Sequence, residues 1–286
     1  MKVTRAVEPL LPLCQRLFPG RLAGLSMALL KATALEITIL AGHLLLYPSG
    51  ITQERRTAPP LPSPDTATLP TGTKPPVVLL HGFIDNRSVF VLLRRSLAQH
   101  GRQRVESLNY SPLTCDIRTA AGLLGRHIEE ICERTGQERV DIVGHSLGGL
   151  IARYYVQRLG GDTRVRTLVT LGTPHSGTRV VPLMNAHPIV RQMRPDSQVI
   201  EELRLPAPGC RTRFVSFWSD LDQLMVPLET ACVEHPDLLA QNVRVSGIGH
   251  LALPVHPAVA TGIRQALDAE ETGVPAAART GGLTVA

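Results

Sequence analysis

From residue 77 onward, short apolar runs alternate with longer stretches in which apolar residues recur at helical spacing. The segment Val77–Leu80 is a continuous apolar run, as expected of a strand that is buried on both faces. Further strands are predicted at 104–108, 139–143, 165–171, 213–217 and 242–246, and helices at 89–99, 117–134, 149–159 and 257–268. Gly101 and Gly136 follow two of these helices as stop signals. Alternation of this kind predicts an α/β fold with a mostly parallel central sheet flanked by helices.

A separate apolar segment, residues 21–51, lies in an N-terminal extension that we place at 1–56. Between positions 22 and 47 its only ionisable residues are Lys31, Glu36 and His43. A bilayer-spanning helix needs about 20 apolar residues, and each charge near its centre costs about 2.5–3.5 kcal/mol. We therefore expect a membrane anchor or an interfacial helix. A true span and a helical pair packed on the main domain are the alternatives that this pattern leaves open.

The remaining boundaries follow from composition. Residues 57–76 are rich in proline and threonine and predict a semi-extended linker. The main domain is expected at 77–270, with an insertion at about 177–209 that contains five prolines. Residues 271–286 are expected to form a flexible C-terminal tail. An apolar N-terminal segment of this kind predicts a membrane-associated or secreted protein, and a cytoplasmic location stays open.

Charge and cysteine content narrow the classes of partner. The 30 Lys and Arg residues against 24 Asp and Glu give a net charge of +6, but the basic residues are dispersed and aromatic residues make up only 3%. This pattern argues against nucleic acid as a partner. The five cysteines form no metal-binding spacing, and no phosphate loop or dinucleotide fingerprint occurs, so we expect no metal and no organic cofactor. Cys210 and Cys232 could pair in an exported protein or remain buried thiols.

The most informative motif is Gly144-His145-Ser146-Leu147-Gly148, at the junction of a predicted strand and the helix after it. In this context G-x-S-x-G predicts a sharp turn that lifts the serine hydroxyl above the sheet edge, and the glycines remove Cβ atoms that would clash there. A serine needs a base to accept its proton and donors for the oxyanion that forms when it attacks a carbonyl. The backbone N–H groups of Phe83 and Leu147 are the expected donors.

These motifs resemble the α/β-hydrolase superfamily, and within it bacterial, actinobacterial-like lipases and esterases. The residues that carry the resemblance are His81-Gly82-Phe83, Gly144 to Gly149, and the run from Leu171 to Gly177, LGTPHSG. It covers residues 75–268. The resemblance implies the α/β-hydrolase fold, a cap over the site at the 177–209 insertion, and a triad in the chain order serine, acid, histidine.

With Ser146 as the nucleophile, the resemblance favours Asp222 over Asp220 as the acid, because it lies shortly before a Val-Pro pair. His250 is favoured as the base because it follows the last predicted strand in a loop with two glycines. His235 and His256 are the alternatives, in a surface loop and at a helix entry respectively.

Three other histidines lie within the motifs themselves. His81 is expected to stabilise a turn, His145 to be buried beside the nucleophile, and His175 to line the mouth of the site.

Together these features predict a serine carboxylic-ester hydrolase that cleaves acylglycerols or similar lipid esters through an acyl-enzyme on Ser146. The apolar character of the cap insertion favours an apolar acyl group. The alternatives are an acyltransferase, thioesterase or polyester hydrolase with the same triad, or a non-catalytic binding protein with a hydrolase fold. A membrane surface is a further expected partner, through residues 21–51.

Overall fold

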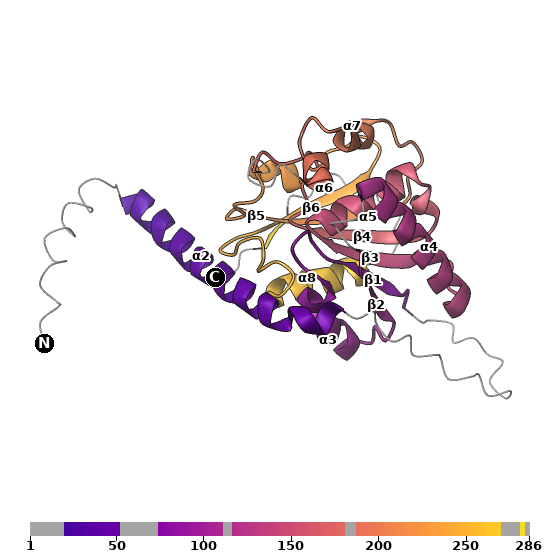
Figure 1. Ribbon diagram of the computed structural model, residues 1–286, viewed down its shortest axis with the longest axis horizontal. Coiled ribbons are helices and arrows are strands. Elements are labelled where there is room, and N and C mark those ends of the chain that lie inside the picture. Colours follow the sequence, from indigo (N-terminus) through magenta and orange to yellow (C-terminus); the bar gives the residue numbers. More distant parts are fainter. Residues whose placement is uncertain (1–19, 52–73, 111–115, 181–186, 270–280, 284–286) are drawn as a thin grey trace, which may run out of the picture.

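The computed structural model describes residues 20–51, 74–110, 116–180, 187–269 and 281–283 (Figure 1). The strands are β1 (Val77–Leu80), β2 (Val105–Leu108), β3 (Val140–His145), β4 (Val165–Leu171), β5 (Arg213–Ser219), β6 (Leu239–Val245) and β7 (Gly281–Leu283). The α-helices are α2 (Gly20–Ile51), α3 (Val91–Gln99), α4 (Ile117–Thr135), α5 (Leu147–Arg158), α6 (Pro188–Gln192), α7 (Gln198–Arg204) and α8 (Pro257–Asp268). Single turns of 3-10 helix lie at η1 (Arg87–Phe90), η2 (Gly161–Thr163) and η4 (Leu228–Ala231).

The strands form one sheet in the order β2-β1-β3-β4-β5-β6-β7, and every neighbouring pair is parallel. In β1 all four residues are buried, because helices cover both faces of the sheet. Since all strands point the same way, the loops that leave their carboxyl ends gather at one edge. In open α/β sheets this is the edge at which ligands bind.

Two apolar cores lie on opposite faces of this sheet. Alternate residues of β1 point to opposite sides, so Val78 and Leu80 pack with α4, α5, α6 and α7, whereas Val77 and Leu79 pack with α3 and α8. Figure 1 shows these helices on either side of the strands. The predicted α/β architecture is therefore confirmed.

Some local predictions need correction. The helix expected from residue 89 begins as the 3-10 turn η1, with α3 starting at Val91. Residues 281–283 pair with β6 as a seventh strand instead of belonging to a flexible tail; a Gly-Gly-Leu segment carries no alternation that could predict this.

Cys210 and Cys232 are free thiols, so the disulfide alternative is wrong. Burial raises the pKa of Cys232 to about 11, which keeps its thiol protonated. Most of the predicted linker, 57–73, and the tail residues 271–280 and 284–286 lie outside the described residues.

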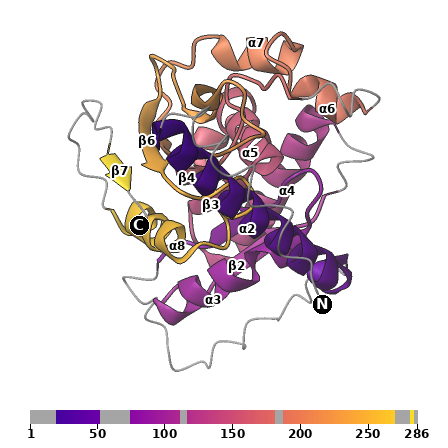
Figure 2. The same cartoon turned by 90° about the vertical axis from the view of Figure 1, so that its left-hand side faces the viewer.

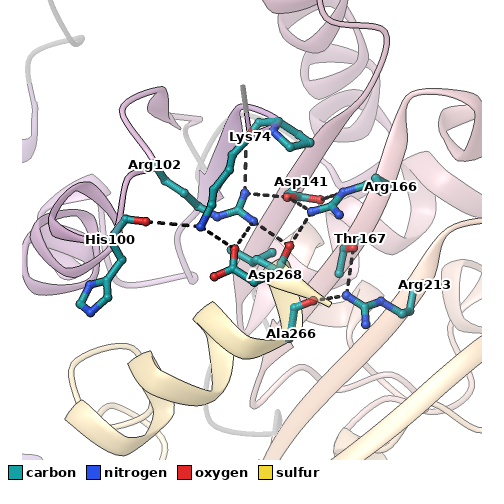
Figure 3. A network of polar contacts seen from close by, with 11 residues as sticks. Lys74, His100, Arg102, Asp141, Arg166, Thr167, Arg213, Ala266 and Asp268 are labelled. Carbon is teal, nitrogen blue, oxygen red and sulfur yellow. Dashed lines mark hydrogen bonds and ion pairs between the residues drawn. The ribbon is translucent and has the colours of Figure 1, made fainter. Parts of the chain in front are cut away.

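A network of charged side chains closes the amino-terminal edge of the sheet (Figure 3). Asp141, on β3, is fully buried, and its carboxylate accepts hydrogen bonds from Arg102 Nη1 at 2.9 Å and Arg166 Nη2 at 2.6 Å. Both guanidinium groups also donate to the carbonyl oxygen of Leu267, at the end of α8. Arg102 further pairs with Asp268, which Lys74 also contacts. The network therefore joins the start of the main domain, the middle of the sheet and the last helix.

Helix α2 crosses the opposite, carboxyl edge of the sheet (Figure 2). Its side chains and carbonyls contact loops that follow several strands: Asn86 after β1, Asn109 after β2, Gln223 after β5 and Leu251 after β6. Within the described part of the N-terminal extension, 20–51, one helix thus packs on the main domain, where the sequence left a helical pair as an alternative.

The buried charge network predicts the most severe loss of stability at Asp141. Replacing Asp141 by Asn leaves Arg102 and Arg166 without their shared counter-ion, and removing one partner of a buried ion pair typically costs about 3–5 kcal/mol. We expect Asp141→Asn to lower the free energy of unfolding in urea by that amount. Glu201→Gln, which removes an exposed pair with Arg204, is the control and is expected to cost less than about 1 kcal/mol. Equal stability of the two variants would contradict this role.

Candidate active site

Ser146 lies at the turn between β3 and α5 with φ 53° and ψ −119°. It is the only non-glycine residue with a positive φ in the described ranges. Such backbone strain is typical of functional sites, where the surrounding structure holds a side chain in a required position. The carbonyl oxygen of Leu171 accepts a hydrogen bond from Ser146 N at 2.9 Å, and Thr173 Oγ1 donates to the carbonyl of Ser146 at 2.9 Å. Strand β4 and the segment that follows it thus fix the turn through these two hydrogen bonds.

The glycines beside Ser146 are required by close approach of the backbone. A Cβ at Gly148 would lie 2.3 Å from the carbonyl oxygen of Leu80, and one at Gly144 would lie 2.6 Å from Gly149 Cα. Neither neighbour is a flexible side chain that could move aside. This is the physical reason for small residues that the motif predicts.

His250 and Asp222 form a buried pair beside this turn. Asp222 Oδ2 lies 2.7 Å from His250 Nδ1, and the two side chains are 1% and 4% exposed. The other carboxylate oxygen of Asp222 accepts a hydrogen bond from Leu224 N at 2.9 Å, which fixes the acid in place. Gly172 allows the pair to form, because a Cβ there would lie 2.9 Å from both Asp222 Oδ2 and His250 Nδ1. Burial by itself would lower the pKa of His250, but the carboxylates of Asp222, Glu36 and Asp85 together outweigh it, so the pKa lies above its ordinary value.

The alternatives to this pair have other partners. Asp220 accepts hydrogen bonds from Arg244 Nη2 at 2.9 Å and from Gly247 N at 3.4 Å. His235 lies at the surface, 3.0 Å from the carbonyl oxygen of Leu205, and His256 caps the start of α8. The structure therefore brings Asp222, and not Asp220, to His250.

The motif histidines have structural contacts. His81 stacks on Tyr110 with ring centroids 4.4 Å apart, and its Nδ1 lies 2.9 Å from the carbonyl oxygen of Gly82. His145 is buried beside the His250 ring, at 4.8 Å between centroids. His175 does not line the mouth of the site as expected: it is buried, with Nε2 2.9 Å from Thr170 Oγ1. Burial holds the pKa of His175 well below its usual range, so it stays neutral.

Ser146 and His250 line one cavity of about 230 Å³. Most of its other walls are apolar, and the apolar residues are Phe83, Ile84, Pro174, Val180, Val190, Met193, Leu224, Met225 and Leu251. Within the described part of the chain no hydrogen bond joins the Ser146 hydroxyl to His250; such bonds are often long in an empty site and tighten when substrate binds.

The residues of the expected oxyanion donors lie close to Ser146. Phe83 lines it, and a Cβ on Gly82 would lie 3.4 Å from Ser146 Cβ, so the turn after β1 runs directly beside the nucleophile. Leu147 is the first residue of α5, and the N–H groups in the first turn of a helix have no carbonyl partner within the helix. The two segments that carry the expected donors therefore both adjoin Ser146.

Three polar residues lie at or near the site that the sequence motifs did not predict there. Asp85 lines the cavity, and its two carboxylate oxygens lie 3.3 Å from His145 Nδ1 and from His43 Nδ1 of α2. Burial opposes ionisation of Asp85, but the two histidines outweigh it and hold its pKa well below the ordinary range. Glu36, also on α2, accepts hydrogen bonds from the backbone next to His250. The sequence holds one indication that Glu36 and His43 contact another part of the protein: ionisable residues within an apolar helix need polar partners.

Among the described residues, no group of three or more His, Cys, Asp or Glu side chains is arranged to hold a metal ion.

Comparison with known proteins agrees with this fold. The α/β hydrolase fold family matches residues 75–204. A palmitoyl-protein thioesterase-dolichyl pyrophosphate phosphatase fusion from Schizosaccharomyces pombe is 32% identical over 124 residues, which cover 37% of this chain and 18% of that protein. A triacylglycerol lipase from Pseudarthrobacter phenanthrenivorans is 30% identical over 118 residues, or 37% of this chain and 35% of that protein. The match thus spans about a third or less of these relatives' lengths.

A solved structure extends the comparison over more of the chain. The mature form of a Bacillus licheniformis lipase superposes with a TM-score of 0.59 at 16% identity, covering 73% of this chain and 96% of that one. At this identity the likeness concerns the fold. Together with the parallel sheet and the matched region, it shows that this chain has the α/β-hydrolase fold.

Proposed function

We propose that the protein is a serine carboxylic-ester hydrolase acting on lipid-like esters. The observation that carries this proposal is the buried His250–Asp222 hydrogen bond of 2.7 Å, because His250 lines the same cavity as Ser146. Support also comes from relatives that include triacylglycerol lipases.

In the proposed reaction, Ser146 Oγ attacks the ester carbonyl carbon while His250 Nε2 takes the hydroxyl proton. Asp222 accepts a hydrogen bond from His250 Nδ1, which fixes the tautomer and stabilises the imidazolium. The N–H groups of Phe83 and Leu147 bind the oxyanion. Collapse of the tetrahedral intermediate breaks the ester C–O bond, and His250 returns the proton to the departing alcohol. Water then attacks the acyl-enzyme by the same route, releasing the acid and restoring Ser146.

The apolar walls of the cavity favour an apolar acyl chain. A volume of about 230 Å³ is small for a long chain, so the carboxyl-proximal part of the acyl group is the part we place there. The thioesterase alternative shares every step up to the leaving group, and it has one favourable observation, the fusion protein whose name includes palmitoyl-protein thioesterase.

The direct test compares p-nitrophenyl esters from acetate to palmitate with the matching acyl thioesters. We expect the wild type to prefer a medium-length oxyester over acetate, and Ser146→Ala to lower kcat by at least about 10⁴-fold, since removing a nucleophile of this kind disables the whole unit. Higher kcat/KM on thioesters would favour the alternative. Hydrolysis that survives in Ser146→Ala would overturn the assignment of the nucleophile.

A second prediction separates the two carboxylates. Asp222→Asn is expected to reduce kcat by about 10⁴-fold because it leaves His250 in the wrong tautomer, whereas Asp220→Asn, the matched control, should stay within about threefold. The base must be neutral, so the rate falls as the pH drops through the pKa of His250. Because Asp222 raises that pKa, the acid limb of the wild-type pH profile should lie above the value of an ordinary histidine, about 6.5, and Asp222→Asn should move it to lower pH. Similar losses in both variants would contradict the assignment.

We further propose that α2 lies on a membrane surface with its apolar side toward the lipid. A stretch of 20 residues, Leu29–Pro48, is long and apolar enough to cross a bilayer by composition, and only 11% of it is buried. Leu30, Ile37 and Leu44 recur every seven residues, or about two helical turns, and are 62–65% exposed, while Leu45 is 82% exposed. Glu36 and His43, two of the polar residues of this stretch, contact the main domain instead.

This arrangement favours a helix lying in the interface over one that spans the bilayer. A spanning α2 would remove Glu36 and His43 from their partners and place them in hydrocarbon, where charged groups are costly. A docked α2 gives the Glu36 carboxylate two N–H donors and places His43 3.3 Å from Asp85. It also turns Leu30, Ile37, Leu44 and Leu45 outward, as interfacial helices do with apolar residues.

Vesicle flotation tests this orientation. We expect the full chain to float with phosphatidylcholine–phosphatidylglycerol vesicles, and the variant with Leu30, Ile37, Leu44 and Leu45 all replaced by Ser to bind at least about tenfold more weakly, since each buried Leu or Ile contributes about 1.5–3 kcal/mol. Leu159→Ser with Leu205→Ser, two exposed apolar residues elsewhere on the surface, is the control. Equal binding of all three proteins would exclude α2 as the lipid contact.

A further inference from the structure

The apolar N-terminal helix carries a carboxylate that reaches the loop of the candidate catalytic histidine. Glu36 Oε2 accepts a hydrogen bond from Leu251 N at 2.8 Å, and Oε1 accepts one from Ala252 N at 3.0 Å. These are the two residues that directly follow His250. The contact therefore joins positions more than 200 residues apart, from a helix outside the matched family region to the centre of the proposed chemistry.

The local backbone is built to receive this carboxylate. A Cβ at Gly249 would lie 2.6 Å from Glu36 Cδ, 2.7 Å from its Cγ and 2.8 Å from its Oε1. The glycine before His250 thus leaves the space that the Glu36 side chain fills. Backbone N–H groups that are buried need acceptors, and here one carboxylate serves two consecutive N–H groups.

Helix α2 also holds the opposite side of the cavity. Asp85, in the turn after β1, lies 3.3 Å from His43 of α2, and Asn86 Nδ2 donates to the carbonyl oxygen of Tyr47 at 2.8 Å. The turn after β1 carries the expected oxyanion donor, Phe83. One helix therefore contacts both loops that must converge on Ser146.

We propose that α2 is part of the active site, and that Glu36 is a positioning residue that fixes the loop of His250 through the amides of Leu251 and Ala252. The inference rests on the proposed ester hydrolysis and assigns to the N-terminal helix a role in it. It also gives a physical reason for a glutamate in the middle of an apolar helix, where it would otherwise oppose membrane binding. Because the same helix presents Leu30, Ile37 and Leu44 outward, the part of the chain proposed to contact lipid is directly attached to the loop that carries the base.

The charges around His250 make this role measurable. The groups that face it are Asp222 from the loop after β5, Asp85 from the turn after β1, His145 at the end of β3, and Glu36 from α2. Burial lowers the pKa of His250, and Asp222, Glu36 and Asp85 raise it. Replacing Glu36 by a neutral residue should therefore lower this pKa, so that the base becomes neutral, and active, at lower pH.

The experiment measures ester hydrolysis by the full chain in Glu36→Gln and Glu36→Ala, with Glu133→Gln, an exposed glutamate on α4, as the matched control. We expect Glu36→Ala to lower kcat at least about tenfold with KM changed less than about threefold, because the base is misplaced while the acyl pocket is intact. Glu36→Gln keeps one acceptor, so its loss of kcat should be smaller, but the acid limb of its pH profile should shift to lower pH. A helix that only stabilised the fold would reduce the amount of active enzyme without moving that limb.

A double-variant cycle keeps the proposal testable if Glu36→Ala is poorly folded. Gly249→Ala forces the Glu36 side chain away from its amides, so it should lower kcat about as much as Glu36→Ala does. In the Glu36→Ala background the clash is gone, so adding Gly249→Ala should cost less than about twofold. Additive losses would overturn the proposal, as would wild-type kcat and an unchanged acid limb in Glu36→Gln. Failure of the wild type itself to hydrolyse any ester would instead contradict the proposed function.

Discussion

The hydrogen bond between His250 and Asp222 is the contact on which the rest of the site depends. It joins the loop after β6 to the loop after β5, and it forms only because Gly172, after β4, leaves room for both side chains. On the other side of the cavity, the glycines of the turn after β3 let Ser146 sit against the end of β1. The parallel sheet is what brings these segments together, since the carboxyl ends of its strands all meet at one edge. A change in the register of any of these strands would separate the serine from the histidine.

Helix α2 has the reverse of the usual orientation of a surface helix. Glu36 and His43 face the protein, whereas Leu30, Ile37, Leu44 and Leu45 face outward. In water alone this arrangement is unfavourable, because a contiguous apolar surface remains exposed. At a lipid surface both faces are satisfied, and the helix joins the proposed lipid contact to the proposed active site through a few hydrogen bonds. Glu36, one of the charges that made the segment a poor candidate for a membrane span, therefore helps to attach it to the main domain.

Much of this structure could be predicted from the sequence because its signals are local. The buried run at β1, the αL glycine Gly136 that ends α4, and the limits of α8 followed from apolar spacing and stop residues. The turn at Ser146 followed from steric demands that only glycine meets. The preference for Asp222 rested on a resemblance, and the pairing itself is visible only in three dimensions, where Arg244 engages Asp220.

The errors and omissions concern long-range contacts. His175 was expected at the mouth of the site, but its partners, Thr170 and the Arg153 side chain that binds its carbonyl oxygen, hold it in the interior. The contact between Glu36 and the His250 loop could not be predicted, because nothing in an apolar segment indicates which distant amides its carboxylate will meet.

The most direct measurement is the site of covalent modification by a fluorophosphonate, determined by mass spectrometry on the full chain. The account predicts one phosphonyl group per molecule, attached to Ser146, with modification at least a hundredfold slower in His250→Ala and absent in Ser146→Ala. Modification of another residue, or a wild-type chain that does not react while folded, would contradict the claim that Ser146 is a nucleophile activated by His250.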